Sequence, residues 1–266
     1  MIGMFDSGLG GLSVWRELTR LLPQEPVIYL ADRAYCPYGG RSHEDILARS
    51  EKITRYLVEQ GARLIVIACN TATSAAAREL RRRHPELPIV GMEPAVKPAA
   101  LHSRSGQIAV LATRATLKGD KFLELKAQYD DSVDILPLPG DGFVELVENG
   151  DLASEQAQRV VERQLQPLRA HTVDQVVLGC THYPFLSPLI ERALPAGVKL
   201  IDPARAVSLQ AERLLQRHGL SSPPGTVPAH RFVTTGEAPG MRHFLRQVLG
   251  HHAEVDTVDL DRIPAH

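Results

Sequence analysis

Two cysteines of this chain follow short apolar runs and precede small hydrogen-bonding residues. Cys69 ends the run that begins at Leu64, in LIVIACNTAT, and Cys180 ends the run that begins at Val176, in VVLGCTHYP. In a parallel α/β sheet, ligands bind beyond the carboxyl ends of the strands, where the next helix begins. Backbone N–H groups and the positive end of a helix dipole would stabilise a thiolate there. The pattern therefore predicts two thiols that can act as acid or base on a bound ligand.

The residues around the two cysteines restrict this chemistry. A phosphate-binding thiolate would need Cys-x5-Arg, but Ala75 and Leu186 stand at the arginine positions, and no two cysteines have the Cys-x-x-Cys spacing of a redox pair. Zinc binding by Cys180, His182 and a distant cysteine matches none of the structural zinc spacings, so we expect no metal. Buried structural cysteines, or a single nucleophile, are alternatives. A reaction with one thiol on each side of a substrate accounts for both cysteines.

Polar residues also follow the first apolar run of the chain. Asp6 and Ser7 close this run in IGMFDSGLGG, and the glycines that follow would let the backbone approach a small anionic ligand closely. Ser13 stands where the dinucleotide-binding fingerprint needs its third glycine, so a dinucleotide site is not predicted. The alternative for this stretch is a tight turn with an N-capping acid.

Further polar groups follow other predicted strands on the same side. CPYGG, which begins at Cys36, follows the second apolar run, although a glycine-proline turn is the alternative there and Cys36 itself is expected to be structural. Hydroxyl groups of Thr71, Thr113 and Thr181 add hydrogen-bond donors, although a threonine in such a position often caps a helix. A ligand beyond these strand ends would meet many polar groups.

Short apolar runs alternate with longer amphipathic segments, which is typical of βαβ units and a parallel sheet. Helices are predicted to start at Ser42, where Asp45 completes a capping box, after Pro203, and after Pro239. The strand–cysteine–helix pattern near residues 69 and 180 predicts an α/β protein of two similar lobes. Each lobe is expected to hold a mostly parallel sheet flanked by helices, with the active site in the cleft between them. The predicted strands are Ile2–Phe5, Val27–Leu30, Leu64–Ala68, Ile89–Gly91, Gln107–Leu111, Val133–Leu136, Gln175–Leu178, Lys199–Ile201 and Arg231–Val233.

Composition excludes several classes of protein. The 266 residues are 44% hydrophobic and 23% charged, with a net charge of −1, which argues against disorder and against a surface built to bind nucleic acid. No apolar run approaches the roughly 20 residues that span a bilayer. The segment MIGMFDSG does not resemble a secretory signal, and three cysteines make no disulfide framework. We therefore expect a cytoplasmic protein that binds neither nucleic acid nor membrane.

Four motifs together resemble those of a known family. DSGLGG, CPYG, ACNTAT and GCTHYP match, in order and approximate spacing, the motif set of the glutamate racemases, and the likeness covers essentially the whole chain. The resemblance implies a cofactor-independent, two-base racemase that interconverts L- and D-glutamate and supplies D-glutamate for peptidoglycan. It also implies two α/β domains around the substrate, residues 1–95 with 207–266 and residues 96–206, and a homodimer.

The resemblance further implies roles for individual residues. Cys69 and Cys180 would be the paired acid and base, with Asp6 beside Cys69 and His182 beside Cys180 helping to move protons. The positions that match substrate-contacting residues of the family are Asp6, Ser7, Tyr38, Gly39, Asn70, Thr71, Thr113, Thr181 and His182.

One segment departs from the family pattern. PGDGFVELVENG, which contains Glu148, stands where the family usually shows Cys-Pro before a Phe-Val-Pro run, so the resemblance does not carry an auxiliary role over to Glu148. Glu148 is a titratable group that could assist Cys180, but the sequence alone favours a solvated helical face for it. His251 and His252 are also expected at the surface. Aspartate or another acidic compound as substrate is an alternative within the same chemistry. A non-catalytic sensor of acidic amino acids is an alternative from a different class.

Overall fold

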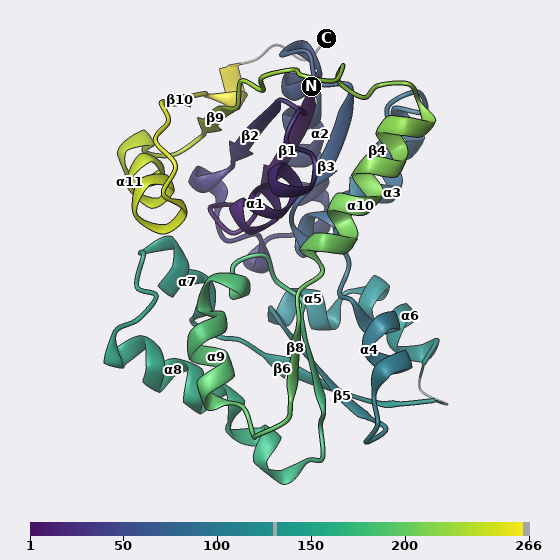
Figure 1. The fold of residues 1–266 in the computed structure, drawn as a ribbon, viewed down its shortest axis with the longest axis vertical. Coiled ribbons are helices and arrows are strands. Elements are labelled where there is room, and N and C mark those ends of the chain that lie inside the picture. The colour runs from purple at the N-terminus through teal and green to yellow at the C-terminus, as the bar shows by residue number, and fades with distance from the viewer. Residues whose placement is uncertain (130–131, 263–266) are drawn as a thin grey trace. The chain divides into compact units, whose positions relative to one another are not determined.

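The structure is a computed structural model that describes residues 1–129 and 132–262. The chain divides into two compact units, of which unit 1 comprises Met1–Met92 with Ala204–His266 and unit 2 comprises Glu93–Pro203. Figure 1 shows both units as sheets flanked by helices, as the sequence predicted. Residues 263–266 of the predicted first domain lie outside the described residues.

The sheet of unit 1 is parallel in every described pairing, with the strand order β10-β9-β2-β1-β3-β4. Its central strands are buried along their whole length, which explains why their sequences are apolar without alternation. The strands are β1 (Ile2–Asp6), β2 (Val27–Ala31), β3 (Leu64–Ile67), β4 (Ile89–Gly91), β9 (Arg231–Thr234) and β10 (Val255–Thr257).

Helices cover both faces of this sheet. α1 and α10 pack together, and α2 packs against α3. The predicted capping box at the start of α2 is confirmed, because the Ser42 hydroxyl accepts a hydrogen bond from the backbone N–H of Asp45. The helices of unit 1 are α1 (Leu12–Leu21), α2 (His43–Glu59), α3 (Asn70–Arg83), α10 (Ala204–Arg217) and α11 (Ala238–Leu249), with 3₁₀ turns η1 (Arg33–Tyr35), η2 (Tyr38–Gly40) and η5 (Leu260–Arg262).

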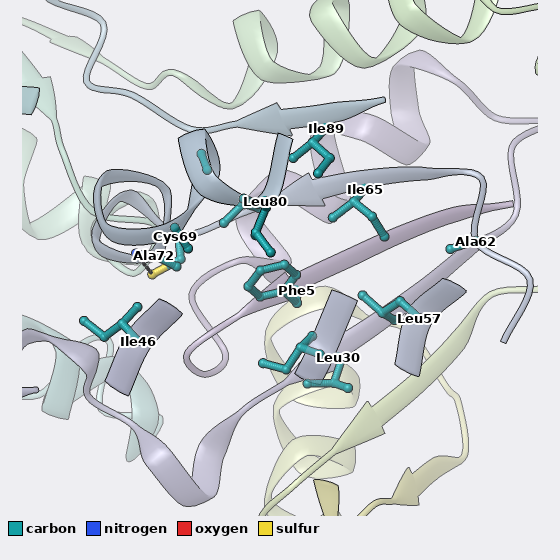
Figure 2. Packing of buried hydrophobic residues seen from close by; sticks show 14 of the residues in the cluster. Phe5, Leu30, Ile46, Leu57, Ala62, Ile65, Cys69, Ala72, Leu80 and Ile89 are labelled. Atoms are coloured by element: carbon teal, nitrogen blue, oxygen red, sulfur yellow. Dashed lines mark hydrogen bonds between the residues drawn. The ribbon is translucent and has the colours of Figure 1, made fainter. Parts of the chain in front are cut away.

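A hydrophobic core joins α2 and α3 to the sheet. Phe5 and Leu30 from β1 and β2 meet Leu57 of α2 and Leu80 of α3 in one buried cluster. Figure 2 shows this cluster and places Cys69 beside Ala72, at the end of β3 where α3 begins. The burial of large apolar side chains, each contributing about 1.5–3 kcal/mol, thus fixes the strand ends on which the functional side chains stand.

Unit 2 repeats this design on a smaller scale. Its sheet is parallel in every described pairing, with the order β6-β5-β7-β8. The strands are β5 (Gln107–Ala112), β6 (Asp134–Pro139), β7 (Gln175–Leu178) and β8 (Lys199–Ile201). The helices are α4 (Val96–His102), α5 (Arg114–Lys118), α6 (Asp120–Ala127), α7 (Phe143–Glu148), α8 (Glu155–Leu165) and α9 (Ser187–Ala193), with 3₁₀ turns η3 (Gln166–Ala170) and η4 (Tyr183–Leu186). No helix in the described ranges combines the length and apolar character that a membrane span requires.

The structure differs from the sequence prediction at a few element ends. The predicted domain boundaries, 95/96 and 206/207, lie three residues further along the chain than the unit boundaries, because α10 begins at Ala204 and packs on α1. β6 continues through two prolines to Pro139, which an edge strand tolerates because one side of it needs no hydrogen-bond donors. β10 was not predicted, because VDT is too short for a period to be recognised.

His251 was expected at the surface, but it is half-buried and packs in an aromatic cluster. The Trp15 ring lies 5.4 Å from the His230 ring, 5.2 Å from the Phe232 ring and 5.0 Å from the His251 ring, measured between centroids. Burial lowers the pKa of His230 and of His251, and the charge of the neighbouring histidine lowers each pKa further. Both imidazoles therefore pack as neutral rings, whereas His252 is exposed as predicted.

This cluster should make the stability of unit 1 depend on pH. The pKa of His230 lies below its ordinary value of 6.5 in the folded chain, so the unfolded chain binds this proton more readily. The stability contributed by the neutral ring is present above the unfolded pKa and is lost as the pH falls toward the folded pKa. We expect the thermal unfolding midpoint, followed by Trp15 fluorescence, to decrease between about pH 7.5 and about pH 5.5, and to decrease less in His230→Gln.

The exposed His243 of the same unit provides the control. His243→Gln should show the wild-type decrease. An equal decrease in His230→Gln and the wild-type chain would contradict the assignment.

Candidate active site

In unit 1, the strand order reverses at β1, which pairs with β2 on one side and β3 on the other. Ligands of open α/β sheets bind at such a switch point, beyond the carboxyl ends of the strands. The last register pair of β1 and β3 is Phe5 with Ile67, so two residues further along both strands Ser7 meets Cys69. The Cys69 Sγ lies 4.0 Å from the Ser7 Oγ. The first predicted cysteine therefore stands at the ligand side of the switch point.

Unit 2 has the same reversal at β5, which pairs with β6 and β7. The last register pair of β5 and β7 is Leu111 with Leu178, so counting two residues further brings Thr113 and Cys180 to corresponding positions. Each unit thus places one cysteine and one hydroxyl residue beyond the strands that flank its switch point. The sequence similarity between the segments near residues 69 and 180 therefore reflects the strand topology that the two units share.

Cys69 is the N-cap of α3, at the start of the helix that the sequence predicted to follow it. Its backbone is extended, with φ −148° and ψ 120°, and its Sγ accepts a hydrogen bond from the backbone N–H of Ala72 at 3.5 Å. An N-capping side chain satisfies an otherwise unpaired amide and lies at the positive end of the helix dipole. Both effects favour the negatively charged thiolate over the neutral thiol.

The side chain of Ser7 lies between those of Asp6 and Cys69 and connects them. The Asp6 carboxylate is fully buried and accepts a hydrogen bond from the Gly11 N–H at 2.7 Å, and the Ser7 Oγ lies 3.5 Å from its other oxygen. A Cβ at Gly11 would lie 2.7 Å from the Asp6 Cβ and 2.8 Å from the Tyr29 hydroxyl. Gly11 therefore permits close approach to an internal carboxylate, whereas the sequence had suggested an approach to a ligand.

Asn70 follows Cys69 as the first residue of α3. Its side chain is buried, yet neither its amide oxygen nor its amide nitrogen has a hydrogen-bond partner in the described part of the chain. A buried polar group without a partner is destabilising by about 1–3 kcal/mol. Thr71, next in the same helical turn, is half-buried. We define the unit 1 site as Asp6, Ser7, Cys69 and Asn70.

The surroundings of Cys180 differ from the prediction. A 3₁₀ turn, η4, follows where the sequence predicted a helix, and α9 begins only at Ser187. The Cys180 Sγ instead lies 3.8 Å from Nδ1 of His182, which is almost completely buried. Thr181, between them, is also buried. The imidazole ring can donate a hydrogen bond to sulfur or accept one from it, depending on its tautomer.

The expectation of a solvated Glu148 is wrong. Its Oε1 lies 2.8 Å from Nε2 of His182, and the side chains of Glu148 and His182 are 14% and 2% exposed. α7, which carries Glu148, packs against η4, and the Phe143 and Tyr183 rings lie 5.0 Å apart in an edge-to-face arrangement. The thiol, imidazole and carboxylate of unit 2 therefore form a continuous chain of groups that can exchange protons. We define the unit 2 site as Thr113, Glu148, Cys180 and His182.

Thr113 serves as a helix cap, which is the alternative that the sequence left open. Its Oγ1 accepts a hydrogen bond from the Thr116 N–H at 3.2 Å and starts α5. Its hydroxyl group is thus hydrogen-bonded within unit 2. It still lies beyond β5, next to the strand that leads to Cys180.

Comparison with known proteins identifies the family of this chain. Residues 2–211 match the model of the Asp/Glu/Hydantoin racemases. The chain belongs to the Asp/Glu/Hydantoin racemase family. It is 47% identical over 256 residues to the glutamate racemase of Ectopseudomonas mendocina (strain ymp), with 96% of each chain covered. Family membership confirms the resemblance seen in the four motifs and the prediction that the chain is an isomerase.

Solved structures of glutamate racemases share the fold. A glutamate racemase isoform of Bacillus anthracis superposes with a TM-score of 0.89 at 31% identity, covering 98% of this chain and 97% of the other. The Escherichia coli glutamate racemase, solved in complex with L-glutamate and the activator UDP-MurNAc-Ala, gives a TM-score of 0.86 at 32% identity, with 97% of both chains covered. The predicted α/β fold with two helix-flanked parallel sheets is therefore also that of racemases of this family.

Tyr38 and Gly39 lie in η2, which follows β2 of the unit 1 sheet. The Tyr38 hydroxyl donates a 2.6 Å hydrogen bond to Asp32, a fully buried residue that the sequence reasoning did not single out. Burial and the adjacent Asp32 carboxylate raise the pKa of Tyr38 well above its ordinary value, so the hydroxyl remains protonated. The Tyr38 hydroxyl is thus held by a hydrogen bond within unit 1.

Asp32 could have been noticed from the sequence. It directly follows the apolar run of β2, in YLADRAY, and lies one residue beyond Ala31, the register partner of Asp6. Arg49, which pairs with Asp32 at 2.8 Å, carries no such signal because it lies within the amphipathic α2.

The Gly11–Asp6 contact yields a test that needs no activity assay. Gly11→Ala should lower the free energy of unfolding of unit 1 by about 1–3 kcal/mol, because the new methyl group must displace Asp6 or Tyr29. Urea unfolding followed by fluorescence of Trp15, the one tryptophan of the chain, measures this change.

Gly40→Ala is the matched control, because a Cβ at Gly40 would have no neighbour within 4 Å among the described residues. Its free energy of unfolding should stay within about 0.5 kcal/mol of the wild-type value. Equal stability of Gly11→Ala and Gly40→Ala would show that the contact is not tight.

Proposed function

We propose that this chain interconverts L- and D-glutamate by a two-base mechanism without a cofactor, with Cys69 and Cys180 on opposite faces of the α-carbon. The observation that carries the proposal is the placement of one cysteine beyond the switch-point strands of each unit. Support for glutamate as the substrate comes from the relatives, which are named glutamate racemases, and from the complex of one of them with L-glutamate.

Two bases are needed because racemisation removes the α-proton on one face and returns a proton on the other. One cysteine, as thiolate, would take the α-proton, so that the C–H bond breaks and an S–H bond forms. The opposite cysteine, as thiol, would then give its proton to the carbanion and become thiolate. The direction reverses when the other enantiomer is bound, so neither cysteine is dedicated to one role.

The surroundings of each cysteine support this exchange of roles. At Cys69, the amide of Ala72 favours thiolate, and the Ser7–Asp6 pair provides a path by which a proton can leave or return. At Cys180, His182 can donate a proton or accept one, and Glu148 on the far side of the ring stabilises the positive imidazolium. Both sites thus hold proton-transfer groups within reach of sulfur.

The carbanion would be stabilised by fixed hydrogen-bond donors, which act strongly where water is excluded. In our proposal the two carboxylates of glutamate contact backbone N–H groups and side chains of Ser7, Asn70 and Thr181. The Tyr38–Gly39 turn, Thr71, Thr113 and His182 complete the binding groups. The buried, unpartnered amide of Asn70 supports its role most directly, because a carboxylate would accept from its nitrogen.

The biological role follows from the product. We propose that the enzyme acts in the cytoplasm as a homodimer, without nucleic-acid or membrane partners, and supplies D-glutamate for peptidoglycan. The support is its membership of the racemase family together with its near-neutral net charge of −1.

Replacement of either cysteine tests the mechanism. Cys69→Ser and Cys180→Ser should each lower the racemisation rate by about 10²- to 10⁴-fold, because a serine hydroxyl is too weak an acid to hold the base form. In D₂O each variant should still exchange the α-proton of one enantiomer, and the two variants should prefer opposite enantiomers, since one functional thiol remains on one face.

Circular dichroism and Trp15 fluorescence confirm folding in this experiment, and aspartate is assayed alongside glutamate. Near-normal racemisation by either variant would refute the two-thiol assignment. A higher kcat/KM for aspartate than for glutamate would refute the substrate.

Asn70 offers a separate test of substrate binding. Asn70→Leu removes a buried amide without changing the volume much, so the thermal unfolding midpoint should stay the same or rise. The KM for glutamate should rise by at least about tenfold, the size of a lost hydrogen bond to a charged group.

Asn70→Asp should raise KM at least as much, because the added charge repels the substrate carboxylates. An unchanged KM in both variants would remove Asn70 from the binding site.

A further inference from the structure

Asp32 is the centre of a buried hydrogen-bond network in unit 1. Its carboxylate accepts hydrogen bonds from the Tyr38 hydroxyl at 2.6 Å, from Arg49 Nε and Nη2 at 2.9 and 2.8 Å, and from the Thr235 hydroxyl at 2.8 Å. Asp32 is fully buried and the Arg49 side chain is 6% exposed. The Asp32–Arg49 pair is therefore a bidentate ion pair that is almost excluded from water.

This pair orients the turn that carries Tyr38. A carboxylate held by a bidentate arginine has a fixed orientation, so its remaining lone pairs point in fixed directions. One of them receives the Tyr38 hydroxyl, and the Tyr38 ring belongs to the same buried cluster as Cys69. A shift of Asp32 would therefore move Tyr38 and the backbone of Gly39 together.

Arg49 is held from its other side by the C-terminal turn η5. Its Nη1 lies 3.3 Å from Oδ1 of Asp261, and the same oxygen accepts a 2.7 Å hydrogen bond from Nζ of Lys52. The guanidinium carbon of Arg49 lies 3.9 Å from the centroid of the Tyr35 ring. Leu260, next to Asp261, anchors η5 in the core at 1% exposure. A segment more than 200 residues away in the sequence thus contacts the arginine that orients Asp32.

We propose that Arg49, acting through Asp32 and held by Asp261, is a positioning residue for the Tyr38–Gly39 edge of the glutamate site. Arg49 touches no reacting atom in this scheme, and the C-terminal turn becomes a functional part of unit 1. The proposal rests on the function proposed above. Its signature is an effect on substrate binding that exceeds the effect on turnover, because the turn binds a carboxylate and takes no part in proton transfer.

Steady-state kinetics of racemisation test the proposal. Asp261→Asn should raise the KM for glutamate by about fivefold and leave kcat within about twofold, since one charged contact to Arg49 is weakened. Arg49→Met should raise KM by at least about tenfold, and Arg49→Lys, which keeps the charge but loses the bidentate geometry, should recover part of this loss. Glu79→Gln, which alters an exposed ion pair with Arg82 outside the network, should leave both constants unchanged.

A double-mutant cycle separates positioning from general destabilisation. Tyr38→Phe removes the hydroxyl that Asp32 orients. If both residues act through Asp32, the double variant Tyr38→Phe/Arg49→Lys should raise KM by a factor clearly smaller than the product of the two single-variant factors. Effects that multiply, or an unchanged KM in Asp261→Asn and Tyr38→Phe, would overturn the proposal. The wild-type assay comes first, so a chain that failed to racemise glutamate would be recognised as a failure of the proposed function before any variant is compared.

Discussion

The reversal of strand order at β1 and at β5 is the constraint on which both sites depend. Where the strand order reverses, the loops after two adjacent strands lead to helices on opposite faces of the sheet, and they diverge to leave space for a ligand. In unit 1 this brings Ser7 and Cys69 within 4.0 Å although 61 residues separate them in the chain. The register of neighbouring strands, which is fixed by burial of their apolar side chains, thus decides which polar groups meet.

The two sites share this topology but differ in their chemistry. The sulfur of Cys69 accepts a hydrogen bond from a backbone N–H at the start of a 14-residue helix. The sulfur of Cys180 instead lies near the imidazole of His182, which contacts the carboxylate of Glu148. The amide is a fixed donor that cannot change its protonation state, and the imidazole can. In the proposed mechanism, the onward transfer of the proton would therefore differ between the two sites, through Ser7 and Asp6 at Cys69 and through His182 and Glu148 at Cys180.

Buried charge in unit 1 has a structural purpose that the apolar core cannot serve. Removing Asp32 and Arg49 from water is costly, and the attraction between them offsets this cost only when the geometry is good and the remaining hydrogen-bonding positions are filled. Tyr38, Thr235 and Asp261 fill them. Apolar side chains of equal volume would pack as well, but they would not fix the direction of the Tyr38 hydroxyl, so the pair gives the turn after β2 one defined position.

The sequence by itself determined the local features of this protein. It identified nine of the strands to within a few residues, the Ser42 cap, and the two cysteines at strand ends, because apolar runs, caps and glycines act on neighbouring residues and leave a readable pattern. Tertiary structure alone decided that Glu148 meets His182, that Arg49 orients Asp32, and that Trp15 packs against His251. These contacts join segments far apart in the chain, and they depend on how helices pack on a sheet, which no local pattern of residue types encodes.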